Sequence, residues 1–140
     1  MVDSSPWDPS SEFGGRIERL LRDEALLWIT HVNSRCAPVT NAVWFMWDGT
    51  SVIVYNQPTS LRVRALPNNP KVTVHFNSDF HGLETTIIAG RAEVAETLAA
   101  DRSAYFKKYE KAIEQLHLGV DFFESYSVPV KIVPTRSYGY

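Results

Sequence analysis

The sequence predicts a mostly β protein, a small barrel of antiparallel strands with helical covers. Apolar runs of strand-forming residues, separated by turn sequences, fill most of the stretch from residue 25 to residue 96. Apart from one short helix, helical spacing of apolar residues occurs before and after that stretch. The 140 residues suit a single domain, with residues 1–10 expected to be flexible and residues 11–140 to form the barrel.

The first helix is expected in "DPSSEFGGRIERLLRDEAL", where Ser10 or Ser11 can cap it and Ile17, Leu20 and Leu21 form an apolar stripe. The run "ALLWITHV" then favours a strand, and "VTNAVWFMW" a longer one. Both faces of the longer strand carry apolar side chains. We therefore expect both faces to be buried, one in the barrel and the other in a subunit interface or an aromatic ligand site.

The middle of the chain contains two sequence signals that mark where strands turn or end. Asp48-Gly49 predicts a hairpin that leads into the strand "SVIVYNQ". Pro58 ends that strand, and "LRVRAL" predicts a short helix that stops at Pro67. The next strands are "KVTVHFN" and "ETTIIAGRAEVAE", with Gly90 expected at a bulge or a close backbone approach.

The C-terminal part returns to helical spacing and ends in a strand. Apolar residues from Leu98 to Leu116 predict one long helix, with Thr97 as its cap and Gly119 beyond its end. The closing "SVPVKIVPTRSYGY" favours a strand. Its two prolines place that strand at a sheet edge or a bulge, because proline cannot donate to the ladder.

Composition and charge restrict the classes of function. A net charge of −2 provides no global basic field for nucleic acid or an anionic membrane. Cys36 is the single cysteine, so an intrachain disulfide and a multi-cysteine zinc site are excluded. The polar, acidic start has no apolar run typical of a signal peptide, and no stretch approaches a membrane span. We expect a cytoplasmic protein that acts on a small molecule.

Two arginines stand where the short helix begins. Arg62 and Arg64 follow Thr59 and Ser60, either of which can cap the helix. A helix N-terminus disfavours cations and leaves backbone N–H groups free, so one phosphate held by the hydroxyl and guanidinium groups would satisfy both. The alternative is that the arginines pair with carboxylates or face water. The residues alone leave both interpretations open.

The segment "VTNAVWFMWDGTSVIVYNQPTSLRVRALPNNPKVTVHF" resembles the flavin- and deazaflavin-binding split barrels of the pyridoxamine 5'-phosphate oxidase-like superfamily. Among these, it is most similar to the actinobacterial group that uses coenzyme F420. The resemblance continues through "IIAGRAE", "YFKKYEKAIEQL" and "YSVPVKIVPTR", from about Glu18 to Tyr138. It implies a six-stranded split barrel and a homodimer with cofactor sites at the subunit interface.

The resemblance also implies roles for individual residues. Three residues border the ring system, three contact the ring and ribityl chain, four hold the phosphate, and one strand, of the same or of the other subunit, approaches the ring. The residues that border the ring are Val43, Trp44 and Phe45, and those that contact the ring and ribityl chain are Tyr55, Asn56 and Gln57. The phosphate is held by Thr59, Ser60, Arg62 and Arg64, and the approaching strand carries His75 and Asn77. The family usually has lysine where Arg62 stands, and arginine binds phosphate with a planar fork instead of a point charge.

The function implied is an F420-dependent reductase that transfers a hydride to a small unsaturated or quinone-like acceptor. Two alternatives remain: an FMN-binding oxidoreductase of the same fold, and a carrier or sensor of flavin, F420 or haem. No catalytic side-chain motif occurs, which suits an enzyme whose cofactor carries the chemistry. His75 and His81 could suggest a metal pair, but no cysteine partner or ligand motif supports one, so no metal is expected.

Overall fold

The computed structural model, which describes residues 1–95 and 102–140, contains one antiparallel sheet of eight strands. The path through the sheet is β3-β2-β6-β7-β8-β5-β4, and β1 pairs with the far end of β8. The strands are β1 (Val2–Ser4), β2 (Leu27–Val32), β3 (Pro38–Val43), β4 (Met46–Trp47), β5 (Val52–Asn56), β6 (Lys71–His75), β7 (Thr86–Val94) and β8 (Val128–Gly139). The expected antiparallel, mostly β architecture is confirmed.

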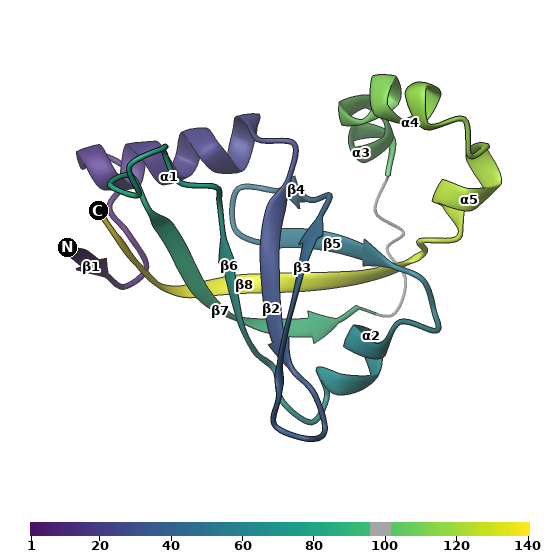
Figure 1. The fold of residues 1–140 in the computed structure, drawn as a ribbon, viewed down its shortest axis with the longest axis horizontal. Helices are drawn as coiled ribbons and strands as arrows, with labels where there is room; N and C mark the ends of the chain where they lie inside the picture. Colours follow the sequence, from purple (N-terminus) through teal and green to yellow (C-terminus); the bar gives the residue numbers. More distant parts are fainter. Residues whose placement is uncertain (96–101) are drawn as a thin grey trace.

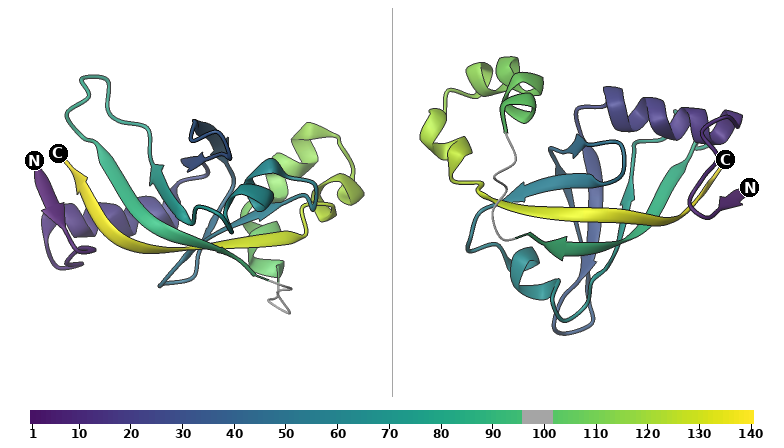
Figure 2. Two further views of the ribbon diagram at one scale, coloured as in Figure 1. Left: turned by 90° about the horizontal axis from the view of Figure 1, so that it is seen from below. Right: turned by 180° about the vertical axis from the view of Figure 1, so that it is seen from behind.

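Helices cover the curled sheet at two ends (Figures 1 and 2). Helix α1 lies over one end, and the short helix α2 lies beside the β2–β3 hairpin. Helices α3, α4 and α5 form a cap at the other end, where β5 and β8 meet. The helices are α1 (Glu12–Asp23), α2 (Leu61–Ala65), α3 (Ser103–Lys108), α4 (Glu110–Leu116) and α5 (Val120–Glu124).

Helix α1 closes the core of the curled sheet. Its N-cap is Ser11, whose hydroxyl accepts a hydrogen bond from the backbone N–H of Gly14 at 2.9 Å. Phe13, Ile17 and Leu21 are buried against strand residues of the core. The short N-terminal helix and its serine cap are therefore confirmed.

The expected count of six strands is wrong for two reasons. Residues 2–4 form β1, which pairs with residues 137–139 of β8, although the flexibility expected of residues 1–10 stays a prediction. The long strand expected from Val39 to Trp47 is divided into β3 and β4, because Trp44 and Phe45 leave the ladder.

The break at Phe45 is stabilised by side chains of the cap. The Tyr109 hydroxyl accepts a hydrogen bond from the Phe45 N–H at 2.9 Å. It also lies 2.7 Å from the carbonyl of Ala25 and 3.0 Å from that of Phe45, and it can donate to one of these at a time. The amine of Lys108 donates to the Phe45 carbonyl at 3.1 Å. The peptide groups lost from the ladder are thus satisfied by the cap.

The last strand is central, so of the two places expected for its prolines the sheet edge is wrong, whereas a bulge is found at Pro134. β8 pairs with β7 on one side and with β5 on the other. Pro134 lies opposite Gly90, where the register of the β7–β8 ladder shifts. A Cβ on Gly90 would approach the carbonyl oxygen of Val133 to 2.7 Å, so the expected bulge with close backbone approach is confirmed there.

The long helix expected from Leu98 to Leu116 is interrupted, because two short helices, α3 and α4, occupy its described part, and α5 follows beyond Gly119. Tyr109 has φ −105° and ψ 12° between α3 and α4, and α4 ends at His117 in the left-handed conformation, with φ 53°. Gly119, with φ 81°, then precedes α5. The expected cap Thr97 and first position Leu98 lie outside the described residues.

β3 forms one end of the sheet path, and much of it faces solvent in the single chain. Thr40, Asn41 and Ala42 are exposed, so the burial expected on both faces of this strand is not achieved within one chain. None of the helices in the described residues has the length and apolar character needed to span a membrane.

Replacing Tyr109 with phenylalanine tests the link between the cap and the sheet. Tyr109→Phe leaves the buried N–H of Phe45 without an acceptor, and we expect the free energy of unfolding to fall by about 1–3 kcal/mol. The measurement is chemical denaturation followed by circular dichroism. Tyr105→Phe is the matched control, because Tyr105 is a buried residue of the same cap and no hydrogen bond joins its hydroxyl to another described residue. Equal losses in the two variants would contradict the assignment.

Candidate functional site

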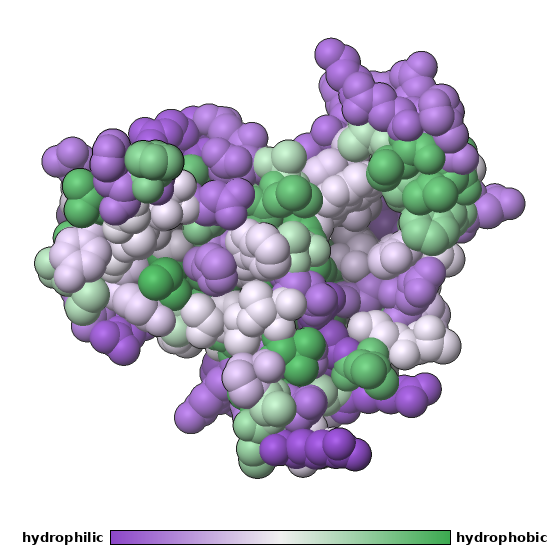
Figure 3. Space-filling model, viewed as in Figure 1, coloured by the Kyte–Doolittle hydropathy of each residue, from purple (hydrophilic) through white to green (hydrophobic). Residues whose placement is uncertain are grey.

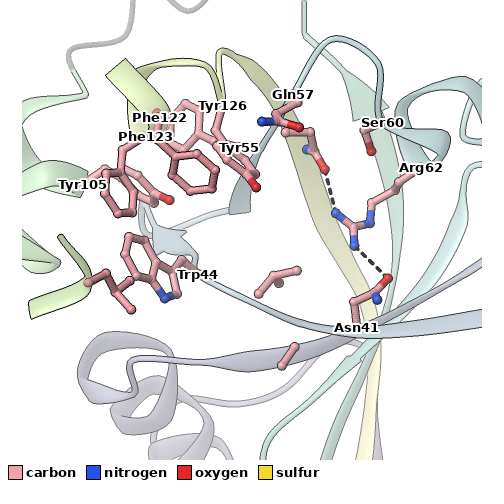
Figure 4. Close-up of a pocket in the computed structure, with 14 residues that line it drawn as sticks. Asn41, Trp44, Tyr55, Gln57, Ser60, Arg62, Tyr105, Phe122, Phe123 and Tyr126 are labelled. Atoms are coloured by element: carbon pink, nitrogen blue, oxygen red, sulfur yellow. Dashed lines mark hydrogen bonds between the residues drawn. The ribbon is translucent and has the colours of Figure 1, made fainter. Parts of the chain in front are cut away.

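A cavity of about 460 Å³ lies between the cap, the two strands β3 and β5, and α2. The surface is hollowed there, and apolar side chains of the cap line the flank of the hollow (Figure 3). The cavity has a polar end and an aromatic end (Figure 4). Asn41, Asn56, Gln57, Ser60 and Arg62 form the polar end, and Trp44, Tyr55, Tyr105, Phe122, Phe123 and Tyr126 form the aromatic end. Ala42, Val43 and Leu116 complete the lining.

Arg62 is the only charged residue that lines the cavity among the described residues. Its Nη1 donates to Asn56 Oδ1 at 2.6 Å, and its Nη2 donates to Asn41 Oδ1 at 3.3 Å. Its Nε is buried and has no hydrogen-bond partner in the described part of the chain. Burial lowers the pKa of the guanidinium, and no salt bridge joins it to a described carboxylate. Such a charge lacks the compensation that buried cations normally have.

Asn56 positions the guanidinium. Its side chain is buried at the end of β5, and its Nδ2 donates to the carbonyls of Val54 at 3.0 Å and Val128 at 3.3 Å. These two contacts orient the amide so that Oδ1 faces Arg62. The side chain that anchors the arginine is therefore itself fixed by strands β5 and β8.

Helix α2 presents one arginine inward and the other outward. The helix has five residues, so Arg62 and Arg64 belong to its last turn as much as to its first. The expected conflict with the helix dipole is therefore wrong, because one turn does not separate the two ends. Arg64 is exposed. The Ser60 side chain makes no capping hydrogen bond and lines the cavity.

Trp44 is enclosed by two rings of the cap. Its indole stacks on Tyr109 with a centroid distance of 4.3 Å and an interplanar angle of 3°, and on Phe123 at 5.5 Å and 2°. The rings of the protein thus cover its π-faces, and a ligand in the cavity can meet only the remaining edge of the indole. The break in the strand after Val43 places Trp44 in this position.

Two tyrosines at the aromatic end, Tyr55 and Tyr105, remain neutral. Burial raises the pKa of Tyr55 and of Tyr105, and nearby Tyr109 has a pKa raised to about 12 by the same cause. Their hydroxyls therefore stay protonated through the physiological range. The aromatic end offers flat apolar surface without charge, which suits a planar organic group.

The sequence matches the family model described as pyridoxamine 5'-phosphate oxidase over residues 13–132. The chain belongs to the pyridoxamine 5'-phosphate oxidase family. No curated protein matches the sequence significantly.

Solved structures share the fold of this family member at low sequence identity. An F420 reductase is 20% identical, with a TM-score of 0.63, and the match covers 86% of this chain and 94% of that one. A conserved hypothetical protein from Mycobacterium tuberculosis is 18% identical, with a TM-score of 0.71 and coverage of 96% and 88%. The haem storage protein HutZ from Vibrio cholerae is 13% identical, with a TM-score of 0.60 and coverage of 92% and 95%.

The structure brings together seven of the twelve residues expected at the site. Val43, Trp44, Tyr55, Asn56, Gln57, Ser60 and Arg62 all line the cavity. Their role in cofactor binding stays a prediction. They come from the break after β3, the end of β5 and the start of α2, which meet at one edge of the sheet.

The other five residues lie outside the cavity lining. Phe45 is fully buried in the core, and Thr59 and Arg64 are exposed. His75 stacks on Trp28, with ring centroids 6.3 Å apart, and Trp28 Nε1 donates to Asn77 Oδ1 at 2.9 Å. His75 and Asn77 therefore form a cluster with Trp28 instead of approaching the cavity of their own chain.

The sequence interpretation missed the contribution of the cap. Tyr105 of α3 lines the cavity together with residues of α4 and α5. The residues not foreseen are Asn41, Ala42, Tyr105, Leu116, Phe122, Phe123 and Tyr126. The aromatic cluster "FFESY" after Gly119 was the available signal for the last three.

Asn41→Asp tests whether the uncompensated charge of Arg62 matters. The new carboxylate would take the place of an amide oxygen 3.3 Å from Arg62 Nη2 and compete with any bound anion. We expect affinity for FMN and for sulfate, measured by calorimetry, to fall by about tenfold or more, the range of one lost charged contact. Asn41→Ala, which removes the hydrogen bond without adding charge, should change affinity by less than about threefold. Similar affinities for the two variants would contradict the anion site.

Proposed function

We propose that the protein is an F420-dependent reductase that passes a hydride to a small unsaturated or quinone-like acceptor. The observation that carries this proposal is Arg62, a half-buried cation with no carboxylate partner among the described residues, at one end of a cavity whose other end is aromatic. A ligand with an anionic group joined to a planar ring system would satisfy both ends. F420 and FMN both have this form.

The charge of the polar end favours F420 over FMN. The phosphate of F420 is a diester with one negative charge, whereas the phosphomonoester of FMN carries close to two at neutral pH. One described cation lines the cavity, so a monoanion would be neutralised and a dianion would leave excess buried charge. The Nε of Arg62, which has no partner among the described residues, and the hydroxyl of Ser60, which makes no capping hydrogen bond, are the groups that would hold the phosphate.

The remaining residues would orient the reactants and exclude water. Reduced F420, when bound, supplies the hydride. The aromatic side chains of the cap give an apolar surface for a planar acceptor. The neutral hydroxyls of Tyr55 and Tyr105 add no negative charge that would oppose hydride transfer to it. No residue is assigned the role of a catalytic acid, and His75 lies away from the cavity of its own chain.

Two alternatives remain. The first is an FMN-dependent oxidoreductase, which the family match supports equally. The second is a haem carrier, which the structural likeness to HutZ supports. No histidine, cysteine or methionine lines the described part of the cavity, and burial opposes ionisation of Tyr55 and Tyr105 as axial ligands. Haem bound within one chain is therefore the weaker alternative.

The purified protein separates these functions directly. A colourless preparation that binds added F420 more tightly than FMN and consumes reduced F420 with a quinone or enone would support the proposal. A yellow preparation with a flavin spectrum would support the FMN alternative, and a Soret band the haem alternative. Tight F420 binding without turnover against a panel of acceptors would indicate a carrier.

The two arginines of α2 provide a matched pair of variants. Arg62→Ala should weaken F420 binding by about one to two orders of magnitude, because a charge-assisted contact contributes roughly 1.5–3 kcal/mol. Arg64→Ala should change affinity by less than about threefold, because this side chain is exposed and its charge is screened by water. Fluorescence titration measures both. Unchanged affinity together with a lower melting temperature for Arg62→Ala would make the arginine structural.

We also propose a homodimer. β3 ends the sheet path with exposed residues, and Trp28 and His75 form a stacked pair on the neighbouring strands. Exposed Leu26 and Trp28 add apolar surface beside this edge. A second copy would cover these groups and could bring its own Trp28–His75 cluster toward the cavity.

Light scattering at micromolar concentration should report about twice the chain mass of 15.9 kDa. Trp28→Glu places a charge in the proposed interface and should shift the protein toward monomer. Arg22→Glu, at an exposed position on α1, is the control and should leave the mass unchanged. A wild-type protein that is monomeric and active would contradict the dimer.

A further inference from the structure

Arg102 is a cation of the cap to which the proposed function gives no role. It stands at the N-cap position of α3, it is half-buried, and it does not line the cavity. No salt bridge joins it to a carboxylate in the part of the chain that the structure describes. Its guanidinium group contacts main-chain oxygens and aromatic rings instead, and these partners belong to different elements.

The guanidinium of Arg102 joins the first helix of the cap to the end of the last one. Its Nη1 donates to the carbonyl of Tyr126 at 3.2 Å and lies 3.5 Å from that of Glu124, the last residue of α5. Carbonyls at the end of a helix have no partner within it, so a cation that donates to them fixes this part of the chain. Between the two carbonyls, the Ser125 hydroxyl accepts a hydrogen bond from Gln57 Nε2 at 3.1 Å. The segment after α5 is thus held both from α3 and from the sheet.

The same guanidinium contacts two aromatic rings. Its Cζ is 5.9 Å from the ring centroid of Tyr55 on β5 and 5.3 Å from that of Phe106 on α3. A cation within about 6 Å of a ring centroid is attracted by the electron-rich face of the ring. Tyr55 and Tyr126 both belong to the aromatic end of the cavity (Figure 4). Arg102 therefore contacts one cavity residue from the sheet and one from the cap, although it is outside the lining itself.

We propose that Arg102 is a positioning residue for the planar ring of the ligand, because it fixes Tyr55 and Tyr126 relative to each other before the ring enters. A wall that is already ordered binds a ligand more tightly than one that must be ordered on binding, since ordering side chains costs free energy. The inference deepens the proposed function and rests on its aromatic end being the site of the ring. It does not depend on hydride transfer or on the choice between F420 and FMN.

Arg102 and Arg62 would act at different ends of the cavity. Arg62 would contact the anionic group directly, whereas Arg102 would act on the ring through Tyr55 and Tyr126. Loss of Arg102 should therefore weaken binding of a ring and leave binding of a small anion unchanged. A general loosening of the fold would weaken both, so the two effects can be separated.

Riboflavin, which has a ring and ribityl chain without phosphate, is the probe for the aromatic end, and sulfate is the probe for the polar end. Arg102→Met keeps the apolar stem of the side chain but removes its charge and its donors. We expect its affinity for riboflavin to fall by about tenfold or more, the range of one charge-assisted contact, and its affinity for sulfate to change by less than about twofold. Fluorescence titration measures riboflavin binding, and calorimetry measures sulfate binding.

Two further variants separate position from charge. Arg102→Lys keeps the charge but has a point-like ammonium in place of the planar fork, so its affinity for riboflavin should lie between those of wild type and Arg102→Met. Lys107→Met removes an exposed cation from the same helix and should match wild type with both probes. Unchanged riboflavin affinity in Arg102→Met, or equal losses of riboflavin and sulfate affinity, would overturn the proposal. A wild-type protein that does not bind riboflavin would also overturn it.

Hydrogen exchange of the wild-type protein keeps the test valid if Arg102→Met fails to fold. Riboflavin should slow exchange of the amides of α3 and of residues 122–126 together, because one side chain joins the two segments. Slower exchange in residues 122–126 without a change in α3 would overturn the proposal.

Binding and turnover of F420 are measured separately. Riboflavin binding that depends on Arg102 in a protein without F420 turnover would contradict the reductase and support the role of Arg102. F420 turnover in a protein whose riboflavin affinity is independent of Arg102 would contradict the role of Arg102 alone. Absence of sulfate binding in wild type would contradict the anion site, and the graded riboflavin affinities of the Arg102 variants would still decide this proposal.

Discussion

The hydroxyl of Tyr109 joins parts of the chain that are 64 residues apart and makes the cavity possible. If the strand continued through Trp44 and Phe45, their side chains would project from opposite faces of the sheet. The break turns Phe45 into the core and Trp44 toward the cap, and the hydrogen bonds from Tyr109 and Lys108 satisfy the peptide groups that the break exposes. Because Phe45 is held there, the cap, the end of β5 and α2 enclose one space.

The polar end of that space is organised around an imbalance of charge. Most partly buried arginines form an ion pair with a carboxylate. Arg62 instead donates to two amide oxygens, which orient the guanidinium without neutralising its charge. Amides keep the electrostatic potential of the cavity positive, and the fixed position of Asn56 removes the need to reorganise when a ligand arrives. In the free protein the partial desolvation of the Arg62 charge costs free energy, and a bound anion would offset that cost. This is the pattern expected where stability is exchanged for binding.

The sequence predicted the parts that depend on local chemistry. The serine cap of α1, the hairpin at Asp48-Gly49 and the bulge at Gly90 all follow from residue type and spacing. The predictions that failed depend on distant contacts. Strand propensity alone cannot show that Tyr109 will interrupt a run of apolar residues, nor that the tail of β8 will recruit residues 2–4 as a partner. The long helix is interrupted at Tyr109, whose hydroxyl is held by Phe45 and Ala25 of a distant part of the chain. The aromatic half of the site was missed for the same reason, since the cap reaches it only through the tertiary fold.

The stacked arrangement of Trp44 has a spectroscopic consequence. Its indole is packed between Tyr109 and Phe123 at the wall of the cavity, whereas Trp7 and Trp47 contact each other by α1 and Trp28 lies on the strand next to β3. Flavin and deazaflavin rings absorb light where tryptophan emits, so energy transfer would quench the emission of Trp44 when such a ring enters the cavity. The protein therefore carries its own optical reporter at the wall of the site, and its emission can be followed without attaching a label.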